Sequence, residues 1–258
     1  MKNKVPLILV TNDDGITAPG IKALIEVMKE LGNVVVVAPD SPQSGMGHAI
    51  TLDNPLRLEE VHLFHNVKAY QCSGTPVDCV KLARDKIIGG KPDLCVSGIN
   101  HGSNSSINVI YSGTMSAAME AAIESIPAVG FSLLDYEFEA DFISCKKYVK
   151  QIAKNVLEHG LPDGTLLNVN IPKLPEHKLK GIKIARQAIA KWEEEFQERA
   201  DPRGKKYYWL TGKFVNRDKG EDTDEWALEN GFISVVPVQF DLTAHHAIST
   251  INNTWKLK

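Results

Sequence analysis

The sequence predicts an α/β fold in which a mostly parallel sheet is covered by helices on both faces. Short continuous apolar runs, such as residues 5–10 and 34–38, are typical of strands that are buried on both sides. Segments with apolar residues at helical spacing, such as residues 19–31, lie between such runs. The alternation of the two patterns indicates parallel strands joined by crossover helices.

The individual elements are bounded by residues that favour helix ends. Pro19 suits the first turn of the helix expected over 19–31, and Gly32 closes it. A second helix is predicted from Thr75, because Thr75-Pro76-Val77-Asp78 has the pattern of a capped start. An Ala-rich helix is predicted over 114–125, another helix over 142–159, and strands over 94–96, 128–131 and 166–171.

Two stretches break this alternation. Residues 49–52 and 56–63 are short and extended, which predicts a hairpin-like excursion from the sheet. After about residue 185 the alternation ends, and aromatic residues mix with charges in a segment of strands and loops. We therefore expect a core over 1–185 and a C-terminal extension over 186–258 that serves oligomer contacts, with both forming one domain.

Composition excludes several classes of protein. The 258 residues hold 29 Lys and Arg against 32 Asp and Glu, and this net charge of −3 disfavours binding to long nucleic acids. No run approaches the roughly 20 apolar residues of a membrane span, and no signal peptide is evident, so no membrane association is expected. Four cysteines, at 72, 79, 95 and 145, lack zinc or C-x-x-C spacing and are expected to be buried thiols. Such thiols are typical of a reducing compartment, which predicts a cytoplasmic location.

Adjacent carboxylates follow the first predicted strand. Asp13 and Asp14 stand where that strand ends, and ligands of parallel sheets bind beyond the carboxyl ends of the strands. Two neighbouring carboxylates are costly to hold together unless a cation neutralises them, and such oxygen ligands suit Mg²⁺ or Mn²⁺. The alternative is that one aspartate caps a turn while the other is solvated.

Other predicted strand ends also carry oxygen-bearing side chains. Ser44 follows the second strand and is either a hydroxyl ligand or a turn residue. A loop rich in Gly, Ser and Asn follows the strand at 94–96 and contains Asn100, His101 and Asn104. Such a loop lets a ligand approach the backbone closely, and the alternative is a polar loop closed by local hydrogen bonds. His101 either touches the substrate or is a solvated loop residue, which is the simpler interpretation.

An anion site is predicted where the Ala-rich helix begins. Ser112, Gly113 and Thr114 lie at that N-terminus, where free N–H groups attract phosphate and a glycine permits close approach. The alternative is an ordinary serine or threonine cap. Cation ligands and an anion cradle at one sheet edge would together suit a metal-assisted phosphate hydrolase. The sequence lacks the signatures of a dinucleotide fold, a P-loop, a nucleophile elbow and an H-E-x-x-H zinc site.

Several ordered motifs resemble those of the SurE (survival protein E) family of 5′-nucleotidases. They are Thr11-Asn12-Asp13-Asp14-Gly15, Ala38-Pro39 with Ser44-Gly45, Ser97-Gly98-Ile99-Asn100 with Gly102 and Asn104, and Tyr111-Ser112-Gly113-Thr114. The resemblance continues in Ser73-Gly74-Thr75-Pro76, Asp201-Pro202-Arg203-Gly204, Tyr207-Tyr208-Trp209, Asp222-Thr223-Asp224 and Asp241-Leu242-Thr243. It therefore covers nearly the whole chain.

The resemblance implies a Rossmann-like fold and a metal-dependent phosphomonoesterase. The expected reaction converts nucleoside monophosphates to nucleoside and phosphate, as a 5′-nucleotidase with acid-phosphatase behaviour that could extend to 3′-nucleotides and short polyphosphate. The resemblance also implies one divalent ion per subunit, Mg²⁺, Mn²⁺ or Co²⁺, held by Asp13, Asp14, Ser44 and Asn100. It further implies a homodimer or homotetramer whose subunits exchange their C-terminal parts.

The residues and the resemblance lead to one mechanism. Asp13 or Asp14 accepts the proton of the attacking water, the three residues at the helix start bind the phosphate oxygens, and Asn104 orients the phosphate. No residue is assigned as the acid for the leaving group. Two alternatives are a regulator that binds metal and nucleotide without turnover, and a metal-dependent glycosyltransferase, since paired aspartates serve there as well.

Overall fold

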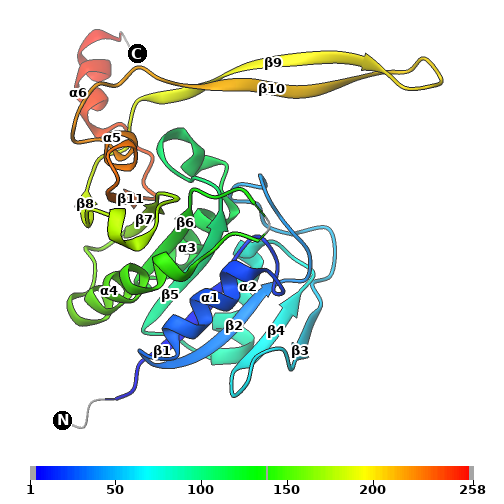
Figure 1. Cartoon of the computed structure of the whole chain (residues 1–258), viewed down its shortest axis with the longest axis vertical. Coiled ribbons are helices and arrows are strands. Elements are labelled where there is room, and N and C mark those ends of the chain that lie inside the picture. Colours follow the sequence, from blue (N-terminus) through cyan, green and yellow to red (C-terminus); the bar gives the residue numbers. More distant parts are fainter. Residues whose placement is uncertain (1–3, 138, 256–258) are drawn as a thin grey trace.

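A mixed sheet of nine strands runs through the centre of the residues described by this computed structural model, 4–137 and 139–255 (Figure 1). The strand order is β3-β4-β2-β1-β5-β6-β7-β11-β8. The strands are β1 Leu7–Thr11, β2 Asn33–Pro39, β3 Leu58–Val61, β4 Lys68–Cys72, β5 Leu94–His101, β6 Ala128–Leu133, β7 Thr165–Ile171, β8 Ile182–Ile184 and β11 Ile233–Gln239.

The middle of the sheet is parallel, as the sequence predicts. Each neighbouring pair from β4 through β2, β1, β5 and β6 to β7 runs in the same direction. Val10 of β1 lies between Val36 of β2 and Val96 of β5, and all three side chains are fully buried. Because the strands share a direction, their carboxyl ends open at one edge, where Thr11 of β1 pairs with Ser97 of β5.

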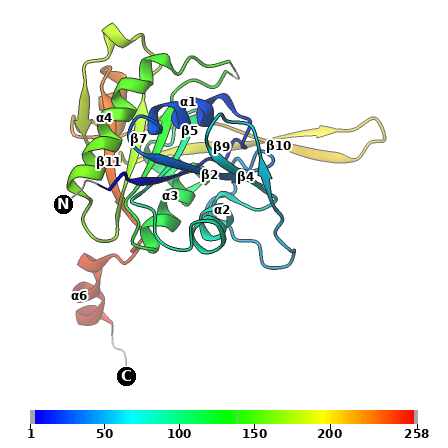
Figure 2. The same ribbon diagram turned by 90° about the horizontal axis from the view of Figure 1, so that it is seen from below.

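Helices cover both faces of the sheet (Figure 2). The helices are α1 Pro19–Met28, α2 Pro76–Leu82, α3 Gly113–Ile123, α4 Ile143–His159, α5 Asp224–Glu229 and α6 His245–Thr254. On one face α1 and α4 enclose a core that includes Leu24 and Val149, and on the other α2 and α3 enclose one that includes Val80 and Ala118. Burial of each large apolar side chain contributes about 1.5–3 kcal/mol, so both faces hold the helices firmly.

The helix starts follow from their local residues. Pro19 occupies the first turn of α1. A reciprocal capping box precedes α2, because the Thr75 hydroxyl accepts from the Asp78 N–H at 3.2 Å and the Asp78 carboxylate accepts from the Thr75 N–H at 2.9 Å. Both predicted starts are confirmed. The chain then continues from α2 into a π-helical segment, Ala83–Ile88, and the short 3₁₀ helices are η2 Ser106–Ile110 and η3 Glu176–Lys178.

The region between β2 and β4 corrects the predicted hairpin. Residues 49–52, expected to be a strand, are irregular, and Thr51 instead donates its N–H and hydroxyl to the Asp78 carboxylate at 3.2 and 2.6 Å. The hairpin forms between β3 and β4, and β4 pairs with β2. The hairpin therefore forms the edge of the central sheet and is not an excursion from it. The sequence did not reveal this, because β2, which pairs with β4, is not adjacent to the hairpin in the sequence.

An antiparallel arm follows residue 185. Its strands, β9 Ala190–Ala200 and β10 Lys206–Asn216, pair along their whole lengths and project away from the sheet (Figure 1). Phe196, Trp209 and Leu210 on this arm are 66%, 59% and 59% exposed. The arm confirms the expected strands and loops over 190–216, whereas the rest of the predicted strand-and-loop extension also contains the helices α5 and α6.

After the arm the chain returns to the central sheet. β11 pairs with β7 on one side and with β8 on the other, so part of the predicted extension belongs to the sheet of the core. The terminal helix α6 has no buried residue and stands away from the sheet (Figure 2). Within the described residues, no helix has the length and hydropathy that crossing a bilayer requires.

Candidate functional site

Asp13 and Asp14 lie directly beyond the carboxyl end of β1. Neither aspartate closes the turn there, because Asn12 does so by donating its Nδ2 to the Gly15 carbonyl at 2.9 Å. Asp13 is only 4% exposed, and its carboxylate accepts a hydrogen bond from the Thr114 hydroxyl. The alternative in which an aspartate is needed to cap this turn therefore does not apply.

The two carboxylates make an environment that favours a cation. Burial, and then the charge of Asp14, raise the pKa of Asp13 from 3.8 to about 6. Burial also raises the pKa of Asp14, against the opposing influence of His101. Two ionised carboxylates in such a place are costly unless a positive charge compensates them.

The N-terminus of α3 meets the carboxylate of Asp13. Gly113 permits this approach, since a Cβ atom there would lie 2.7 Å from the Cβ of Asp13. Ser112 caps the helix by accepting from the Met115 N–H at 3.0 Å, and this leaves its hydroxyl proton to donate. Of the three residues of the predicted anion cradle, Ser112 therefore caps the helix and Gly113 and Thr114 begin it, and that helix start adjoins the predicted cation ligand Asp13.

Asn100 and His101 lie at the carboxyl end of β5, next to β1. Asn100 was expected in a loop, but β5 extends through it after an irregularity in its pairing with β6. The Nδ2 of Asn100 donates to the carbonyls of His101 at 3.2 Å and Gly102 at 3.0 Å. This orientation points the amide oxygen Oδ1, which can accept or ligate, away from these carbonyls. The His101 N–H donates to Asp14 at 3.4 Å, so the two strand ends are joined.

The ring of His101 is held in place by contacts with neighbouring residues. Its Nδ1 is 2.9 Å from the carbonyl oxygen of Glu137, and its ring packs edge-on against Phe142 at a centroid distance of 5.2 Å. These contacts hold the imidazole at the rim of the site. The interpretation of His101 as a simply solvated loop residue is therefore replaced by that of a packed one.

Ser44 lies in an irregular loop that is held beside Asp13. The Gln43 N–H donates to the Asp13 carbonyl at 2.7 Å, and the Gly47 N–H donates to the Tyr111 carbonyl at 3.2 Å. Ser44 itself is exposed. Residues 43–47 thus connect Asp13 with Tyr111, which lies just before α3.

Asn104 lies in a buried polar network with residues of β6 and β7. It is 5% exposed, its N–H donates to Asn170 at 2.8 Å and its Nδ2 donates to Ser132 at 2.8 Å, while Asn168 donates to its carbonyl. These bonds fix the loop that follows β5. Its predicted role in orienting phosphate stays a prediction.

The available donors fit a hard divalent cation. Within the described residues, no group of three or more His, Cys, Asp and Glu side chains could hold a metal ion. The candidate set contains two carboxylates, a hydroxyl and an amide oxygen, which are ligands that Mg²⁺ and Mn²⁺ accept. Thr11 Oγ1, Asn12 Oδ1 and Ser97 Oγ are buried at the same edge without a hydrogen-bond partner in the described part of the chain. Unpartnered oxygen atoms around a carboxylate pair are consistent with a site completed by an ion and its water.

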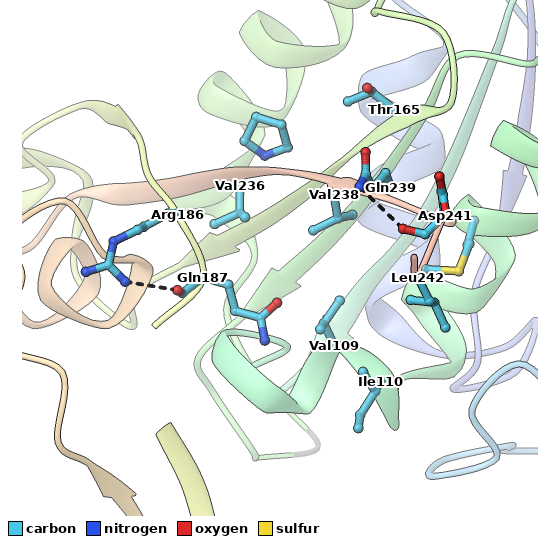
Figure 3. Close-up of a pocket in the computed structure, with 12 residues that line it drawn as sticks. Val109, Ile110, Thr165, Arg186, Gln187, Val236, Val238, Gln239, Asp241 and Leu242 are labelled. Atoms are coloured by element: carbon cyan, nitrogen blue, oxygen red, sulfur yellow. Dashed lines mark hydrogen bonds between the residues drawn. The ribbon is translucent and has the colours of Figure 1, made fainter. Parts of the chain in front are cut away.

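A cavity of about 480 Å³ with a largely apolar lining lies beside β11 (Figure 3). Val109 and Ile110 of η2, Val236 and Val238 of β11, and Leu242 line it. None of the predicted site residues is among its lining residues. The chemistry of the strand ends and the apolar surface near the C-terminus therefore occupy different places.

One cluster near the site was not predicted from the sequence. Glu120 of α3 is buried, and its carboxylate contacts His48 Nε2 at 3.0 Å and Lys81 Nζ at hydrogen-bond distance. The available signal was that Glu120 is the one charged residue of the small, apolar helix Gly113–Ile123. The sequence does not reveal which face of that helix is buried, so the cluster could not be recognised from it.

The chain is similar over its whole length to proteins of one family. A family model described as "Survival protein SurE" matches residues 8–194 of the chain. A relative from Christiangramia forsetii named 5′-nucleotidase SurE is 68% identical over 100% of this chain and 99% of its own. A protein of the same name from Flavobacterium psychrophilum is 70% identical over 98% of each chain.

A solved structure is similar in fold as well as in sequence. The crystal structure of SurE protein from Aquifex aeolicus has a TM-score of 0.83 and 42% identity, and the match covers 96% of this chain and 99% of that chain. The match to the family model extends across all eight predicted site residues, from Asp13 to Thr114.

Proposed function

The chain belongs to the SurE family and is a 5′-nucleotidase, and we propose that it performs this reaction at the shared edge of β1, β5 and the start of α3. The observation that carries the assignment of the site is the buried pair Asp13 and Asp14, with the N-terminus of α3 against Asp13. A phosphate bound there would lie between a cation and the positive end of a helix. The full-length similarity to 5′-nucleotidases supports turnover and does not favour a regulator without activity.

The proposed metal ligands are Asp13, Asp14, Ser44 and Asn100, with one ion per subunit. Mg²⁺, Mn²⁺ and Co²⁺ are the candidates. The raised pKa values of both aspartates and the orientation of the Asn100 amide support this set. When bound, the ion supplies charge for the phosphoryl oxygens and lowers the pKa of water.

The protein groups have separate tasks in the proposed reaction. Asp13 or Asp14 accepts the proton of the attacking water, and the second carboxylate keeps the site negative enough to retain a cation. The hydroxyl of Ser112 and the N–H groups at the start of α3 donate to the phosphate oxygens, where charge grows in the transition state. Thr114 donates to Asp13 and so aligns that carboxylate beside the cradle. We further propose that Asn104 holds the loop behind the phosphate.

The proposed substrate is a nucleoside 5′-monophosphate. The cradle as described recognises the phosphate group and not the sugar or base, so 3′-monophosphates and short polyphosphate are included as candidate substrates. No observation favours the glycosyltransferase alternative. All four cysteines are free and buried. Free thiols suit a reducing compartment, and this supports a cytoplasmic location.

We also propose a homodimer or homotetramer in which the part after residue 185 contacts a second subunit. The exposed aromatic residues of the β9–β10 arm support this arrangement, as does α6, which has no buried residue. The apolar cavity beside β11 offers a further surface for such a contact (Figure 3). Apolar surface of this extent is usually covered by protein.

Phosphate release from a panel of substrates tests the proposed function. The panel contains the nucleoside 5′-monophosphates, their 3′ isomers, short polyphosphate and a nucleotide sugar. The protein is assayed as purified, after EDTA, and after separate addition of Mg²⁺, Mn²⁺ and Co²⁺. Release from 5′-monophosphates that disappears with EDTA and returns with metal supports the proposal. Activity that EDTA does not change would contradict the metal site.

A further inference from the structure

A buried ionic cluster joins the loop of Ser44 to the helix that carries the phosphate cradle. Glu120 of α3 is 3% exposed, and burying an unpaired carboxylate would be strongly unfavourable. Its two oxygen atoms are shared between His48 at 3.0 Å and Lys81. The pairing explains how a charged residue is tolerated in a helix that is otherwise packed with small residues.

The two partners of Glu120 come from different elements. His48 belongs to the segment of residues 41–51, which we name the Ser44 loop, while Lys81 belongs to α2. Glu120 therefore links the Ser44 loop, α2 and α3. Only the His48 contact joins the loop that carries a proposed metal ligand.

Backbone contacts alone leave the centre of the Ser44 loop weakly held. The loop is attached through the Gln43 N–H to Asp13 and through the Gly47 N–H to Tyr111, and its end is attached to the start of α2 through Ala49 and Thr51. Between the first two attachments stand Ser44, Gly45 and Met46, all exposed. The side chain of His48 is the next contact along the loop, and it is 32% exposed.

Through Glu120 and Thr114, helix α3 contacts both the Ser44 loop and Asp13. Thr114 in the first turn of the helix donates to Asp13, and Glu120 is six residues further along, a rise of about 9 Å in a regular helix. One rigid helix thus contacts Asp13 at its start and the Ser44 loop further along.

We propose that His48 and Glu120 are positioning residues that hold the Ser44 loop against α3 and so keep the Ser44 hydroxyl beside Asp13 and Asp14. This inference rests on the proposed metal site. Neither residue touches the reacting groups. Loss of their contact leaves the carboxylates in place and allows the loop to move away, which weakens metal binding without unfolding the protein.

A comparison of His48→Ala with Lys81→Gln tests this role. Each substitution changes one partner of the same buried carboxylate, but only the first releases the Ser44 loop. Mn²⁺ binding to the EDTA-treated protein is measured by electron paramagnetic resonance without substrate. Hydrogen exchange of the peptide over residues 41–51 and the melting temperature are recorded for each variant. Because both substituted side chains are partly exposed, at 32% and 47%, both variants are expected to fold.

His48→Ala should weaken Mn²⁺ binding about tenfold, as expected for loss of a hydrogen bond to a charged group, and should speed exchange in the Ser44 loop. His48→Gln retains a donor for Glu120 and should recover part of the affinity. Lys81→Gln should change the affinity by less than about twofold, since Lys81 does not contact the Ser44 loop and the bonds of Ala49 and Thr51 to the start of α2 remain.

Two results would overturn the positioning role. One is a His48→Ala protein that binds Mn²⁺ as tightly as the wild type, and the other is a Lys81→Gln protein that loses as much affinity as His48→Ala. A wild-type protein that binds no Mn²⁺ and hydrolyses no 5′-monophosphate would instead contradict the proposed metal site itself. The two failures are thereby distinguished.

Discussion

The carboxyl edge of β1 and β5 and the β9–β10 arm use side chains in opposite ways. At the edge, polar groups are buried, with Asp13 at 4% and Thr114 at 0% exposure. On the arm, large apolar groups face outward, with Phe196 at 66% and Trp209 at 59%. Both arrangements are costly in a lone subunit, for different reasons.

The difference indicates what each region still needs. In the proposed site, the buried carboxylates and unpartnered oxygen atoms would be satisfied by a cation, water and phosphate, which are not part of the chain. Exposed aromatic rings are satisfied by apolar surface, which a second subunit can provide. The site should therefore respond to metal and pH, whereas the arm should respond to protein concentration.

The largest expected effect is at the edge. Asp13→Asn removes one charge from the proposed metal site and one candidate proton acceptor, so kcat/KM for a 5′-monophosphate should fall by about 10²–10⁴-fold. Asparagine has nearly the same shape and can still accept from Thr114, so the far-UV circular dichroism spectrum should be unchanged. Asp53→Asn, at an exposed loop position, is the control and should keep full activity. Near wild-type turnover by Asp13→Asn would show that the pair is structural.

The pH dependence of stability offers a second contrast between the regions. The pKa of Asp13 is about 6 in the folded protein and 3.8 in the unfolded chain, so between these values the folded state binds more protons. The metal-free protein consequently loses stability as pH rises from about 4 to above 6, by roughly 3 kcal/mol from this group. Below pH 4 both states are protonated and the group contributes nothing.

Urea unfolding of the EDTA-treated wild type and Asp13→Asn measures this contribution. The stability of Asp13→Asn relative to the wild type should increase by about 3 kcal/mol between pH 4 and pH 8. Added Mn²⁺ should reduce that difference, because it binds the ionised form. A difference that does not change with pH would contradict the burial of an ionisable Asp13.

A smaller effect is expected at the start of α3. Thr114→Val keeps the shape of the side chain and deletes the hydroxyl that donates to Asp13. Loss of a hydrogen bond to a charged group costs about 1.5–3 kcal/mol, or roughly ten- to hundredfold in kcat/KM. Thr114→Ser should restore most of this activity. Ser116→Ala, which removes a hydroxyl bonded to the Ser112 carbonyl on the same helix, is the matched control.

If Thr114→Val and Ser116→Ala lose activity equally, the hydroxyl of Thr114 has no special part in the site. Inhibition by inorganic phosphate separates two causes of a real loss. Weaker inhibition indicates a damaged cradle, whereas unchanged inhibition indicates a misaligned Asp13.

Substitutions on the β9–β10 arm are expected to have the smallest effect on the structure and activity of each subunit. Trp209→Glu with Leu210→Glu places charges on its exposed apolar surface and should lower the mass measured by sedimentation, with an unchanged circular dichroism spectrum. Arg199→Glu alters charge on the same arm without removing apolar surface and should leave the mass unchanged. A wild type that sediments as a monomer at all concentrations would contradict the proposed oligomer.

Much of the core could be predicted because its signals are local. Continuous apolar runs and cap residues identified β1, β2, α1 and α2 within a few residues. The strand-end rule then placed Asp13 and Asn100 at one edge, since parallel neighbours share that edge. Those inferences needed only patterns among residues that are close in the sequence.

The remaining features depend on contacts between distant segments. The sequence pattern after residue 185 does not reveal that β11 enters the sheet between β7 and β8. Residues 49–52 look extended, but Thr51 donates to Asp78 and the Ala49 carbonyl accepts from Thr75, and neither partner lies in a strand. Burial of Glu120 depends on His48 and Lys81 arriving from two other elements. Such features follow from tertiary packing and not from local preference.

Anomalous diffraction from crystals grown with Mn²⁺ tests the central claim most directly, because it locates the ion without reference to activity. The account predicts one strong peak per subunit, bonded to oxygen atoms of Asp13, Asp14, Ser44 and Asn100, and facing the start of α3. A fully occupied peak elsewhere, or none at this edge at saturating Mn²⁺, would contradict the proposed site.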